Sequence, residues 1–502
     1  MRKIFTNESI RAIDKATLQQ DNIPSSKLME RAAKAFVEVF CRMYSDNNKI
    51  TLVCGPGNNG GDGLTIARLL FEQHYPTQVI YCASDSYSED FNLQMERLKK
   101  HNIPHFEYVE MDTYTQSMLQ NSDVIVDAIF GSGLNRIPSG HYAELISGIN
   151  ESNIPVVSVD VPSGIGEHFL PSSLYSIKAS KTITFQLTKL CLLLEENVPF
   201  VGKLHTASIG LSERAIEEEQ SFMYAIEMKD AKHLLRAKKP YYNKWQNGHS
   251  IIVAGSESKG GAALLAAESC LHGGCGMLSA IIPGCLRVAM NTRLPEVMIH
   301  SDLHQHCITH LPILPYADAY GIGCGIGTNE LTQQALFQFL LQSNKPLVLD
   351  ADALNILASH SEHILPRSCI LTPHFKEFDR LTHPHLSHIE RLKTLKEFCV
   401  KYQCTVVLKA THSCVCDKEG HLHFCVYPNA SLGKAGTGDV LTGIITSLLA
   451  QGYDEMSACI IALHLIMSAG KLVSKKYTSY VSSATLLIST LPKAFKKLLR
   501  SK

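Results

Sequence analysis

A carboxylate follows a run of glycines late in the chain. Asp439 comes directly after Gly436, Thr437 and Gly438, and apolar residues recur at helical spacing from Val440 onward. Glycines allow successive backbone N–H groups to point to one place, and a helix N-terminus favours an anion through its unpaired N–H groups and its dipole. The stretch therefore predicts a phosphate site with a carboxylate beside it. The alternative is that Asp439 is an ordinary helix N-cap.

Three polar side chains in the first half follow predicted strands. Asn59 lies in the glycine loop 55–63 after a strand at 50–54, Asp127 ends a strand at 124–127, and Asp160 ends a strand at 156–160. In an open parallel sheet, the loops after the carboxyl ends of the strands lie along one edge and form the ligand crevice. We expect the three side chains to converge there. The alternative for each Asp is that it only starts a turn.

The second half repeats the alternation of strands and helices. Predicted strands lie at 251–254, 277–282, 319–322, 347–350, 370–373 and 406–409, and a helix lies at 262–272. Several of these strands end in polar side chains, namely Asp350 with Asp352, His374 and Lys409. Chemistry is expected at this edge of a second parallel sheet.

Composition limits the class of protein. The 502 residues suggest two to four domains, and we place a junction near 212–225. Lys plus Arg and Asp plus Glu number 47 each, so nothing indicates a nucleic-acid partner. The 16 cysteines include no Cys-x-x-Cys pair, which is typical of reduced thiols in a cytoplasmic protein. No signal peptide and no uncharged apolar stretch of membrane-spanning length is visible, so no membrane partner is expected.

Other segments give local predictions. Residues 6–45 are predicted to form two helices, with Ser25 or Ser26 capping the second, and a charged helix is expected from 213. Closing strands are expected at 182–185, 190–194 and 203–209. Two groups of histidines lack the convergence that zinc requires, and His300, His304, His306 and His310 are interpreted as surface side chains.

The motifs together resemble those of the bifunctional NAD(P)H-hydrate repair enzymes, in which an N-terminal epimerase is fused to a C-terminal nucleotide-dependent dehydratase. In the first half the resemblance rests on GPGNNGGDG (55–63), VDAIFGSGL (126–134) and VDVPSG (159–164). In the second half it rests on PEVM (295–298), LDADALNIL (349–357), LTPHFKEF (371–378) and AGTGDVLTGII (435–445). The resemblance implies an α/β protein with two doubly wound domains. Residues 1–215 would form a Rossmann-like three-layer sandwich and residues 222–502 a ribokinase-like three-layer sandwich.

The resemblance also implies site residues. Asp160 and Asp439 would be catalytic, and a potassium ion would take oxygen ligands from Asn59, Asp127 and Ser163, which suit a hard cation. The implied substrate-binding residues are Asn58, Asn59, Gly60, Gly61, Asp62, Gly131, Ser132, Gly133, Leu134, Asn135, Arg136 and Ile137 in the first domain, and Ala262, Gly327 and His374 in the second. The implied nucleotide-binding residues are Lys409, Ala410, Thr411, His412, Ser413, Gly436, Thr437 and Gly438.

The implied activity is repair of damaged nicotinamide cofactors. The first domain would interconvert the R and S hydrates of NADH and NADPH, with Asp160 as acid and base. Proton abstraction, ring opening, and loss and return of water all remain open as routes. The second domain would phosphorylate the S hydrate with ADP, or with ATP, after Asp439 activates its hydroxyl. Phosphate, a better leaving group than hydroxide, would then depart, so that ADP yields AMP and phosphate. Mg²⁺ is expected with the nucleotide, and a homo-oligomer is expected.

The chain departs from the family pattern at some positions. Asn243, Lys244 and Trp245 replace the usual His-Lys-Gly run, and Lys376 replaces a glycine. Lys434 stands within the glycine loop, where it would add a cation next to the phosphates, and the choice between ADP and ATP stays open.

Two other functions are consistent with the motifs. The second half could be a ribokinase-like kinase acting on another small alcohol, fused to a nucleotide-binding Rossmann-like module. The first half could be a binding module, whose glycine loop serves a partner or a regulatory nucleotide. The fused first half and the LDADALN stretch favour hydrate dehydration over the kinase.

Overall fold

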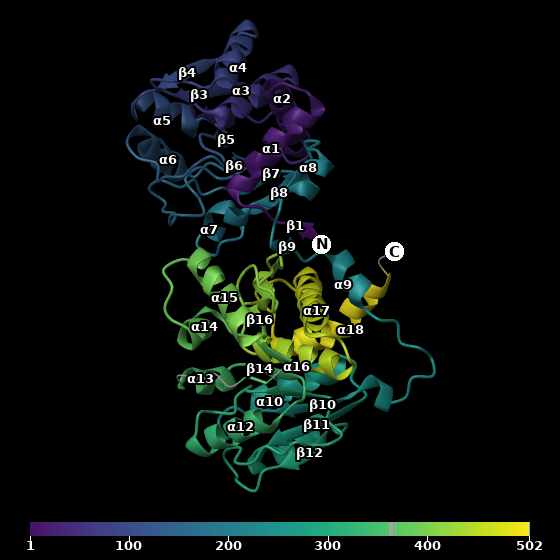
Figure 1. Cartoon of the computed structure of the whole chain (residues 1–502). Coiled ribbons are helices and arrows are strands. Elements are labelled where there is room, and N and C mark those ends of the chain that lie inside the picture. The colour runs from purple at the N-terminus through teal and green to yellow at the C-terminus, as the bar shows by residue number, and fades with distance from the viewer. Residues whose placement is uncertain (361–364, 367, 501–502) are drawn as a thin grey trace. The chain divides into compact units, whose positions relative to one another are not determined.

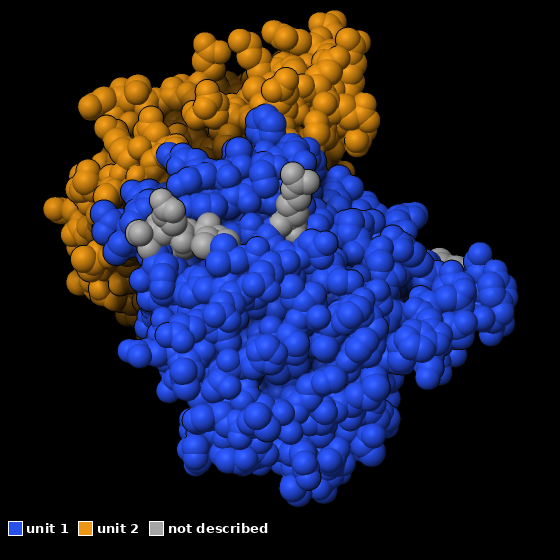
Figure 2. Space-filling view, turned by 60° about the horizontal axis from the view of Figure 1, so that its bottom comes forward, with its two compact units in different colours: residues 1–2, 222–386, 390–502 blue, residues 3–221, 387–389 orange. Residues whose placement is uncertain are grey.

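The structure is a computed structural model, which describes residues 1–360, 365–366 and 368–500. The chain forms two compact units (Figure 2). The N-terminal unit comprises Lys3–Ser221 and Ser387–Ile389, and the C-terminal unit comprises Met1–Arg2, Phe222–Leu386 and Glu390–Lys502. The main division, between Ser221 and Phe222, falls within the segment 212–225. Lys502, the end of the second expected domain, lies outside the described residues.

A parallel sheet forms the centre of the N-terminal unit. Its strand order is β4-β3-β2-β5-β6-β7-β8, and each adjacent pair is parallel. The central strands are apolar runs because both of their faces are buried. The strands are β2 (Ile50–Cys54), β3 (Thr77–Cys82), β4 (His105–Tyr108), β5 (Val124–Ala128), β6 (Val156–Val159), β7 (Lys181–Phe185) and β8 (Lys203–Ala207).

Helices cover both faces of this sheet, because alternate side chains of a strand point to opposite faces. Leu52 and Cys54 pack with α2, α3 and α4, whereas Val53 packs with α5 and α6. The helices are α1 (Asn7–Asp21), α2 (Ser25–Cys41), α3 (Asn58–Glu72), α4 (Glu89–Lys100), α5 (Thr113–Gln120), α6 (His141–Glu151), α7 (Val198–Val201) and α8 (Glu213–Glu218). The predicted three-layer arrangement is confirmed for this unit (Figure 1).

The C-terminal unit contains a larger, mostly parallel sheet. Its strand order is β1-β9-β18-β17-β16-β15-β14-β13-β10-β11-β12, with antiparallel pairing of β17 to both β16 and β18. The strands are β1 (Arg2–Lys3), β9 (Met223–Ala225), β10 (His249–Val253), β11 (Met277–Ile282), β12 (Met298–Ser301), β13 (Ala319–Ile322), β14 (Leu347–Leu349), β15 (Cys369–Leu371), β16 (Thr405–Leu408), β17 (Cys414–Cys416) and β18 (Leu422–Phe424).

Helices again lie on both faces. Ala319 of β13 packs with α16, α17 and α18, while the next residue, Tyr320, stacks against Phe339 of α12 with ring centroids 4.8 Å apart. The helices are α9 (Met228–Leu234), α10 (Gly260–His272), α11 (Arg287–Arg293), α12 (Glu330–Gln342), α13 (Asp352–Ala358), α14 (Phe375–Leu381), α15 (His388–Tyr402), α16 (Thr437–Ala450), α17 (Glu455–Lys476) and α18 (Ala484–Arg500).

Helix α16 is buried along almost its whole length. Every residue from Val440 to Ala450 is buried. A Cβ on Gly443 would lie 2.1 Å from Ser269 Oγ, so this glycine allows α16 and α10 to make very close contact. The segment after the glycine loop is thus a rigid core helix.

One helix, α17, is long and apolar enough to cross a membrane by length and composition. However, 78% of its most apolar window is buried inside the protein. It packs against α18, α16 and α9 in an extensive apolar core of this unit (Figure 1). Its apolar character is thus explained by burial in the core.

Several local predictions are wrong. Residues 190–194 form no strand, because Leu190–Leu192 is a 3₁₀ helix whose turn closes with Leu193 N donating to Leu190 O. These residues are apolar because they are buried, and a short apolar run does not distinguish a strand from a buried turn. Neither Ser25 nor Ser26 caps α2, whose N-cap is Pro24. Helix α3 begins at Asn58, inside the glycine loop.

The strand order reverses direction at β2 in the N-terminal sheet and at β10 in the C-terminal sheet. In the N-terminal unit, β2 connects to β3 on one side and has β5 on the other. In the C-terminal unit, β10 has the same relation to β11 and β13. Ligands of open α/β sheets bind outside the carboxyl ends of the strands at such switch points. These two places are therefore where the site residues should gather.

Close backbone packing at the first switch point requires glycine at some positions of the loop, and this requirement can be tested. A Cβ on Gly60 would lie 1.7 Å from Gly55 O, whereas a Cβ on Gly57 would have nothing within 4 Å. Gly60→Ala should therefore destabilise the N-terminal unit by about 3 kcal/mol or more, lowering its Tm by roughly 10 °C. Scanning calorimetry of the full chain measures this, with Gly57→Ala as the matched control. Equal transitions in both variants would contradict the packing described.

Candidate functional sites in the two units

The first switch point gathers Asn59, Asp127 and Ser163, as expected. Asp127 is fully buried and accepts hydrogen bonds from Ser163 N (2.9 Å), Ser163 Oγ (2.5 Å) and Ser158 Oγ (2.7 Å). Burial raises the pKa of Asp127, while these hydrogen bonds oppose the rise. Asn59 lies against Gly131, where an added Cβ would be 2.9 Å from its Oδ1. Oxygen atoms of Asp127 and Ser163 therefore lie together, and Asn59 lies against the segment that follows β5.

The amide of Asn59 has a buried end without a hydrogen-bond partner among the described residues. That end is assigned as Nδ2, but a half-turn of the side-chain amide would place Oδ1 there. A buried polar atom without a partner is costly, which suggests that the position is completed by a ligand.

Asp160 immediately follows β6 and is held by a buried lysine. Lys189 Nζ lies 2.6 Å from Asp160 Oδ1, and the lysine side chain is 1% exposed. Thr184 Oγ1 and Phe185 N also donate to the same oxygen, at 3.1 and 3.0 Å. Asp160 has a φ of +65°, a left-handed conformation that is uncommon outside glycine, asparagine and aspartate. Asp160 is therefore built into a specific arrangement, beyond what a simple turn would need.

Two further carboxylates belong to the electrostatic surroundings of Asp160. Burial raises the pKa of Asp14 to about 6, an effect that Lys189 opposes and Asp160 reinforces. Burial, followed by the charge of Asp160, also raises the pKa of Asp62 well above its usual range. Asp62 had been identified from the sequence, but Asp14 and Lys189 had not. Lys189 is the fourth residue after the strand β7. Its position shortly after a strand end was the sequence signal that could have identified it as a site residue.

Other predicted substrate residues are split between two places. Leu134, Arg136 and Ile137 line a cavity of about 550 Å³ together with Pro56, Gly57 and Tyr142. Gly60 and Gly61 are buried in the first turns of α3 and serve close packing. The remaining residues of this set lie in the segments around them and are not among those that line the cavity, namely Asn58, Asn59, Asp62, Gly131, Ser132, Gly133 and Asn135.

In the C-terminal unit, Asp439 is not a helix N-cap. Helix α16 begins at Thr437 and its N-cap is Gly436, with φ of +86°. Asp439 is thus the third helical residue, and its carboxylate lies near the glycine turn, 3.9 Å from where a Cβ on Gly436 would be. Burial raises the pKa of Asp439 to about 6, partly offset by its contact with Cys324. The carboxylate is therefore available for proton transfer near neutral pH.

A buried ion pair lies beside this helix start. Lys409 Nζ is 2.7 Å from Asp350 Oδ1 and 4.0 Å from Glu377 Oε2. Thr442 Oγ1 donates to the other oxygen of Asp350 at 2.8 Å. Although burial disfavours the charged form, Lys409 lowers the pKa of Asp350. A Cβ on Gly438 would lie 3.3 Å from Lys409 Nζ, so Lys409 reaches the glycine turn.

Most of the nucleotide residues expected from the sequence line one cavity of about 780 Å³. Its lining comes from four segments, namely His374, then Lys409, Ala410, Thr411 and Ser413, then Pro428 to Ala430, Leu432 to Lys434, Thr437, Gly438 and Leu441, and finally Leu463, Ile466 and Met467 of α17. Gly436, the N-cap of α16, is not among the lining residues. His412 is buried behind this wall, with its Nδ1 3.2 Å from Cys425 O. His374, which the resemblance implies for the hydrate pocket, lines the same cavity. Lys434 also lines it.

Ala262 and Gly327 lie at the second switch point. Gly325 approaches Ala262 so closely that an added Cβ would be 3.0 Å from the Ala262 Cβ. Gly327 N donates to Asp352 Oδ2 at 2.9 Å, and Lys259 Nζ lies 2.8 Å from the same oxygen. Asp352 also contributes to the charge that Asp439 experiences. The Lys259–Asp352 pair was not identified as functional, although the LDAD stretch placed Asp352 at a strand end.

Most of the surface histidines lie as expected. His304, His306 and His310 are exposed, while His300 is half-buried in β12 with its Nε2 3.0 Å from Tyr316 Oη.

Comparisons with known proteins cover both units. Family models described as YjeF-related protein N-terminus and as NAD(P)H-hydrate dehydratase match residues 25–191 and 250–493. A bifunctional NAD(P)H-hydrate repair enzyme Nnr from Dictyoglomus turgidum is 29% identical, over 99% of each chain. One from Thermosynechococcus vestitus is 32% identical, over 89% of this chain and 88% of the relative. A Bacillus subtilis ADP/ATP-dependent NAD(P)H-hydrate dehydratase, co-crystallised with ATP/Mg²⁺, is 26% identical and covers 55% of this chain and 98% of that chain, with a TM-score of 0.48.

The buried pair of Lys189 and Asp160 gives a second prediction. Lys189→Met leaves the Asp160 carboxylate largely buried without its lysine and should destabilise the N-terminal unit by about 3 kcal/mol. Lys189→Met combined with Asp160→Asn should cost clearly less than the sum of the single variants, because the charges are removed together. Thermal unfolding of the full chain measures this cycle. Lys181→Met is the control, since Lys181 donates to Tyr44 Oη at 2.7 Å. Strictly additive effects would argue against a coupled pair.

Proposed function

This chain belongs to the family of bifunctional NAD(P)H-hydrate repair enzymes, and we propose that its two units act in turn on hydrated nicotinamide cofactors. The N-terminal unit epimerises the R and S hydrates of NADH and NADPH. The C-terminal unit dehydrates the S hydrate at the expense of ADP or ATP. The observation that carries the proposal is Asp439, a carboxylate with a pKa of about 6 in the first turn of a helix whose glycine start opens on a cavity lined by Lys409.

In the C-terminal unit, Asp439 accepts the proton of the substrate hydroxyl as that oxygen attacks the terminal phosphoryl group of the nucleotide. The N–H groups at the start of α16, with the helix dipole, stabilise the negative charge that develops there. Lys409 is fixed by Asp350 and contributes a second positive charge. The phosphate then leaves with its C–O electron pair, and the ring loses a proton to restore the double bond. ADP would yield AMP, and ATP would yield ADP.

Magnesium fits this site only as a companion of the nucleotide. Asp350 accepts from Lys409 and Thr442, and Asp352 accepts from Lys259 and Gly327. The charge of each carboxylate is already balanced by a lysine, so the two do not form a magnesium site of their own. We therefore assign no step to magnesium.

In the N-terminal unit, Asp160 is the acid and base for the carbon that bears the hydroxyl group. Lys189 holds it in one orientation, and burial raises the pKa of two nearby carboxyl groups, that of Asp14 to about 6 and that of Asp62 well above its usual range. The cavity lined by Leu134, Arg136 and Ile137 would receive part of the hydrated dinucleotide.

Potassium fits the oxygen groups at this switch point. Asn59 has the buried amide end described above, and Asp127 and Ser163 lie together, with Asp127 accepting only from uncharged donors among the described residues. A bound potassium ion would supply positive charge next to the buried Asp127 carboxylate. Asn59, Asp127 and Ser163 would hold it, which supports the ligand set expected from the resemblance.

Reciprocal variants test the assignment of one reaction to each unit. Asp439→Asn should lower the rate of dehydration by at least about 10³-fold, because the base of the C-terminal unit is lost. Epimer exchange should persist. Asp160→Asn should do the reverse, so that a mixed pair of epimers is half consumed and then stalls. Recovery of NADH absorbance in the presence of ADP, and separately of ATP, measures both. Dehydration by Asp439→Asn at the normal rate would remove Asp439 from the mechanism. A variant Asp160→Asn that consumes both epimers would favour a binding role for the first unit.

The raised pKa of Asp439 also predicts a pH profile. A base must be ionised, so kcat/KM for dehydration should fall about tenfold per pH unit below about pH 6 and level off above it. Steady-state rates with a saturating nucleotide between pH 4.5 and 8 measure this, with intrinsic fluorescence to confirm folding. If kcat/KM instead began to fall only near pH 4, Asp439 would not be the titrating base.

A further inference from the structure

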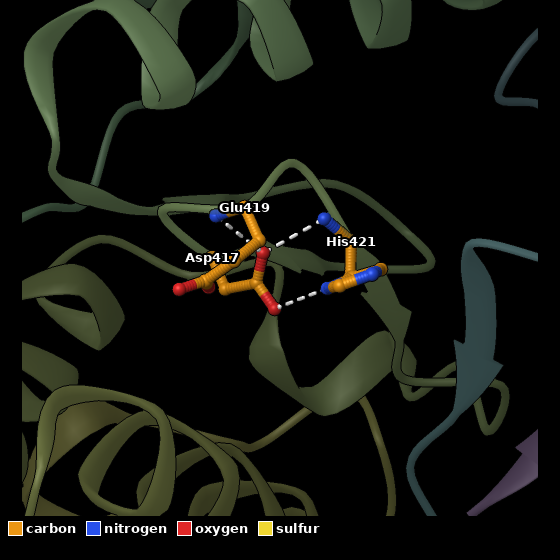
Figure 3. A group of neighbouring side chains, drawn as sticks. All are labelled: Asp417, Glu419 and His421. Atoms are coloured by element: carbon orange, nitrogen blue, oxygen red, sulfur yellow. Dashed lines mark hydrogen bonds and ion pairs between the residues drawn. The ribbon is translucent and has the colours of Figure 1, made fainter.

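The turn between β17 and β18 gathers side chains that commonly bind metal ions. Among the residues that the structure describes, Asp417, Glu419 and His421 form a group in which one ligand atom of each lies within 4.8 Å of the others. Figure 3 shows the Asp417 carboxylate facing the His421 ring, with Oδ2 and Nδ1 3.0 Å apart. The group lies at the opposite end of β16 from Lys409, because β17 is antiparallel to β16 and Cys416 pairs with Val406.

His423 provides the second and independent observation. It lies on β18, two residues after His421, which directly precedes that strand, and the Tyr224 ring contacts both imidazoles. His423 is 9% exposed, and its Nε2 is buried without a hydrogen-bond partner among the described residues. That Nε2 lies 3.6 Å from Asp417 Oδ2, beyond hydrogen-bond distance.

The other nitrogen of the same ring indicates what Nε2 carries. His423 Nδ1 lies 3.2 Å from Met1 Sδ. A thioether sulfur only accepts, so Nδ1 approaches it as the N–H donor, and Nε2 is the ring nitrogen left to bind a ligand beside Asp417. A metal ion between Nε2 and the Asp417 carboxylate would be bound by both groups.

We propose that Asp417, His421 and His423, with Glu419 as a fourth ligand, bind one divalent transition-metal ion, and that Zn²⁺ matches the site best. Two imidazoles and carboxylate oxygens are ligands that zinc prefers. Tetrahedral zinc with bonds of 2.0–2.1 Å sets neighbouring ligand atoms about 3.3 Å apart. The two separations here, 3.0 Å for His421 and 3.6 Å for His423 from Asp417 Oδ2, bracket that value.

The surroundings hold the two rings in place. Tyr224 of β9 stacks on His423 with ring centroids 5.2 Å apart, and Phe222 stacks on His421 at 5.8 Å. Asp417 is further fixed by N–H groups of Glu419 (3.0 Å) and His421 (2.7 Å). Such support reduces the cost of ordering the ligands. Bound zinc would tie the hairpin together at this part of the sheet and has no part in the two reactions.

Zinc binding to the full chain tests the proposal. Protein stripped with EDTA is titrated with ZnCl₂ by calorimetry, and Co²⁺ is used as a second probe because tetrahedral Co²⁺ gives intense visible absorption. The variants are His421→Gln and His423→Gln. His310→Gln is the control, since His310 is an exposed histidine of the same unit. Circular dichroism and the Tm of the stripped proteins confirm that each variant folds.

The expected result is one equivalent of Zn²⁺ with a Kd of about 1 μM or tighter and a rise in Tm on binding. Each cluster variant should weaken binding at least about tenfold, while the control binds as the wild type does. Absence of a saturable equivalent overturns the proposal, and so does unchanged binding in either cluster variant, because the zinc would then sit on other histidines of this chain.

Discussion

The pairing of buried carboxylates with lysines is the interaction on which both crevices depend. Asp160 has Lys189 at 2.6 Å, Asp350 has Lys409 at 2.7 Å, and Asp352 has Lys259 at 2.8 Å. Each acid follows the end of a buried parallel strand, where its charge would be costly without a partner. Asp439 differs, because the described ion pairs include no lysine for it and burial raises its pKa to about 6. The paired carboxylates thus keep the crevice in shape, and the unpaired one is left free to exchange a proton.

Placement of these groups follows from the parallel sheets. In each sheet, one pair of neighbouring strands marks the place where the strand order changes direction. These pairs are β2–β5 and β10–β13. The loops that leave these strands have little room, as the contact of Gly55 with Ile129 O shows. Glycines in the loops therefore serve backbone packing first. The open space next to them, and the exposed N–H groups of the helices that follow, become the binding site as a result.

The sequence was most informative where a side chain ends a strand. Apolar runs such as Ile50–Cys54 and Met277–Ile282 were predicted with their observed limits, because both faces of a buried parallel strand must be apolar. Residues 190–194 misled for the same reason, since burial alone gives an apolar run. Lys189 was missed because its partner Asp160 is distant in sequence. The chain brings the two together only when it returns after β7, and no local pattern encodes that contact. The sequence left open whether Asp439 is the N-cap of its helix. Only the structure, in which α16 begins at Thr437, decides against it.

The burial of α16 determines which part of the nucleotide cavity can adjust. With Val440 to Ala450 enclosed by the core and Gly443 in close contact with α10, the Asp439 carboxylate is carried on a tightly packed helix. Another part of the cavity lining, within residues 428–434, belongs to a loop with one short 3₁₀ turn. We therefore expect that loop to adjust to nucleotides that differ by one phosphate. Selectivity between ADP and ATP can then evolve without a change in the position of Asp439.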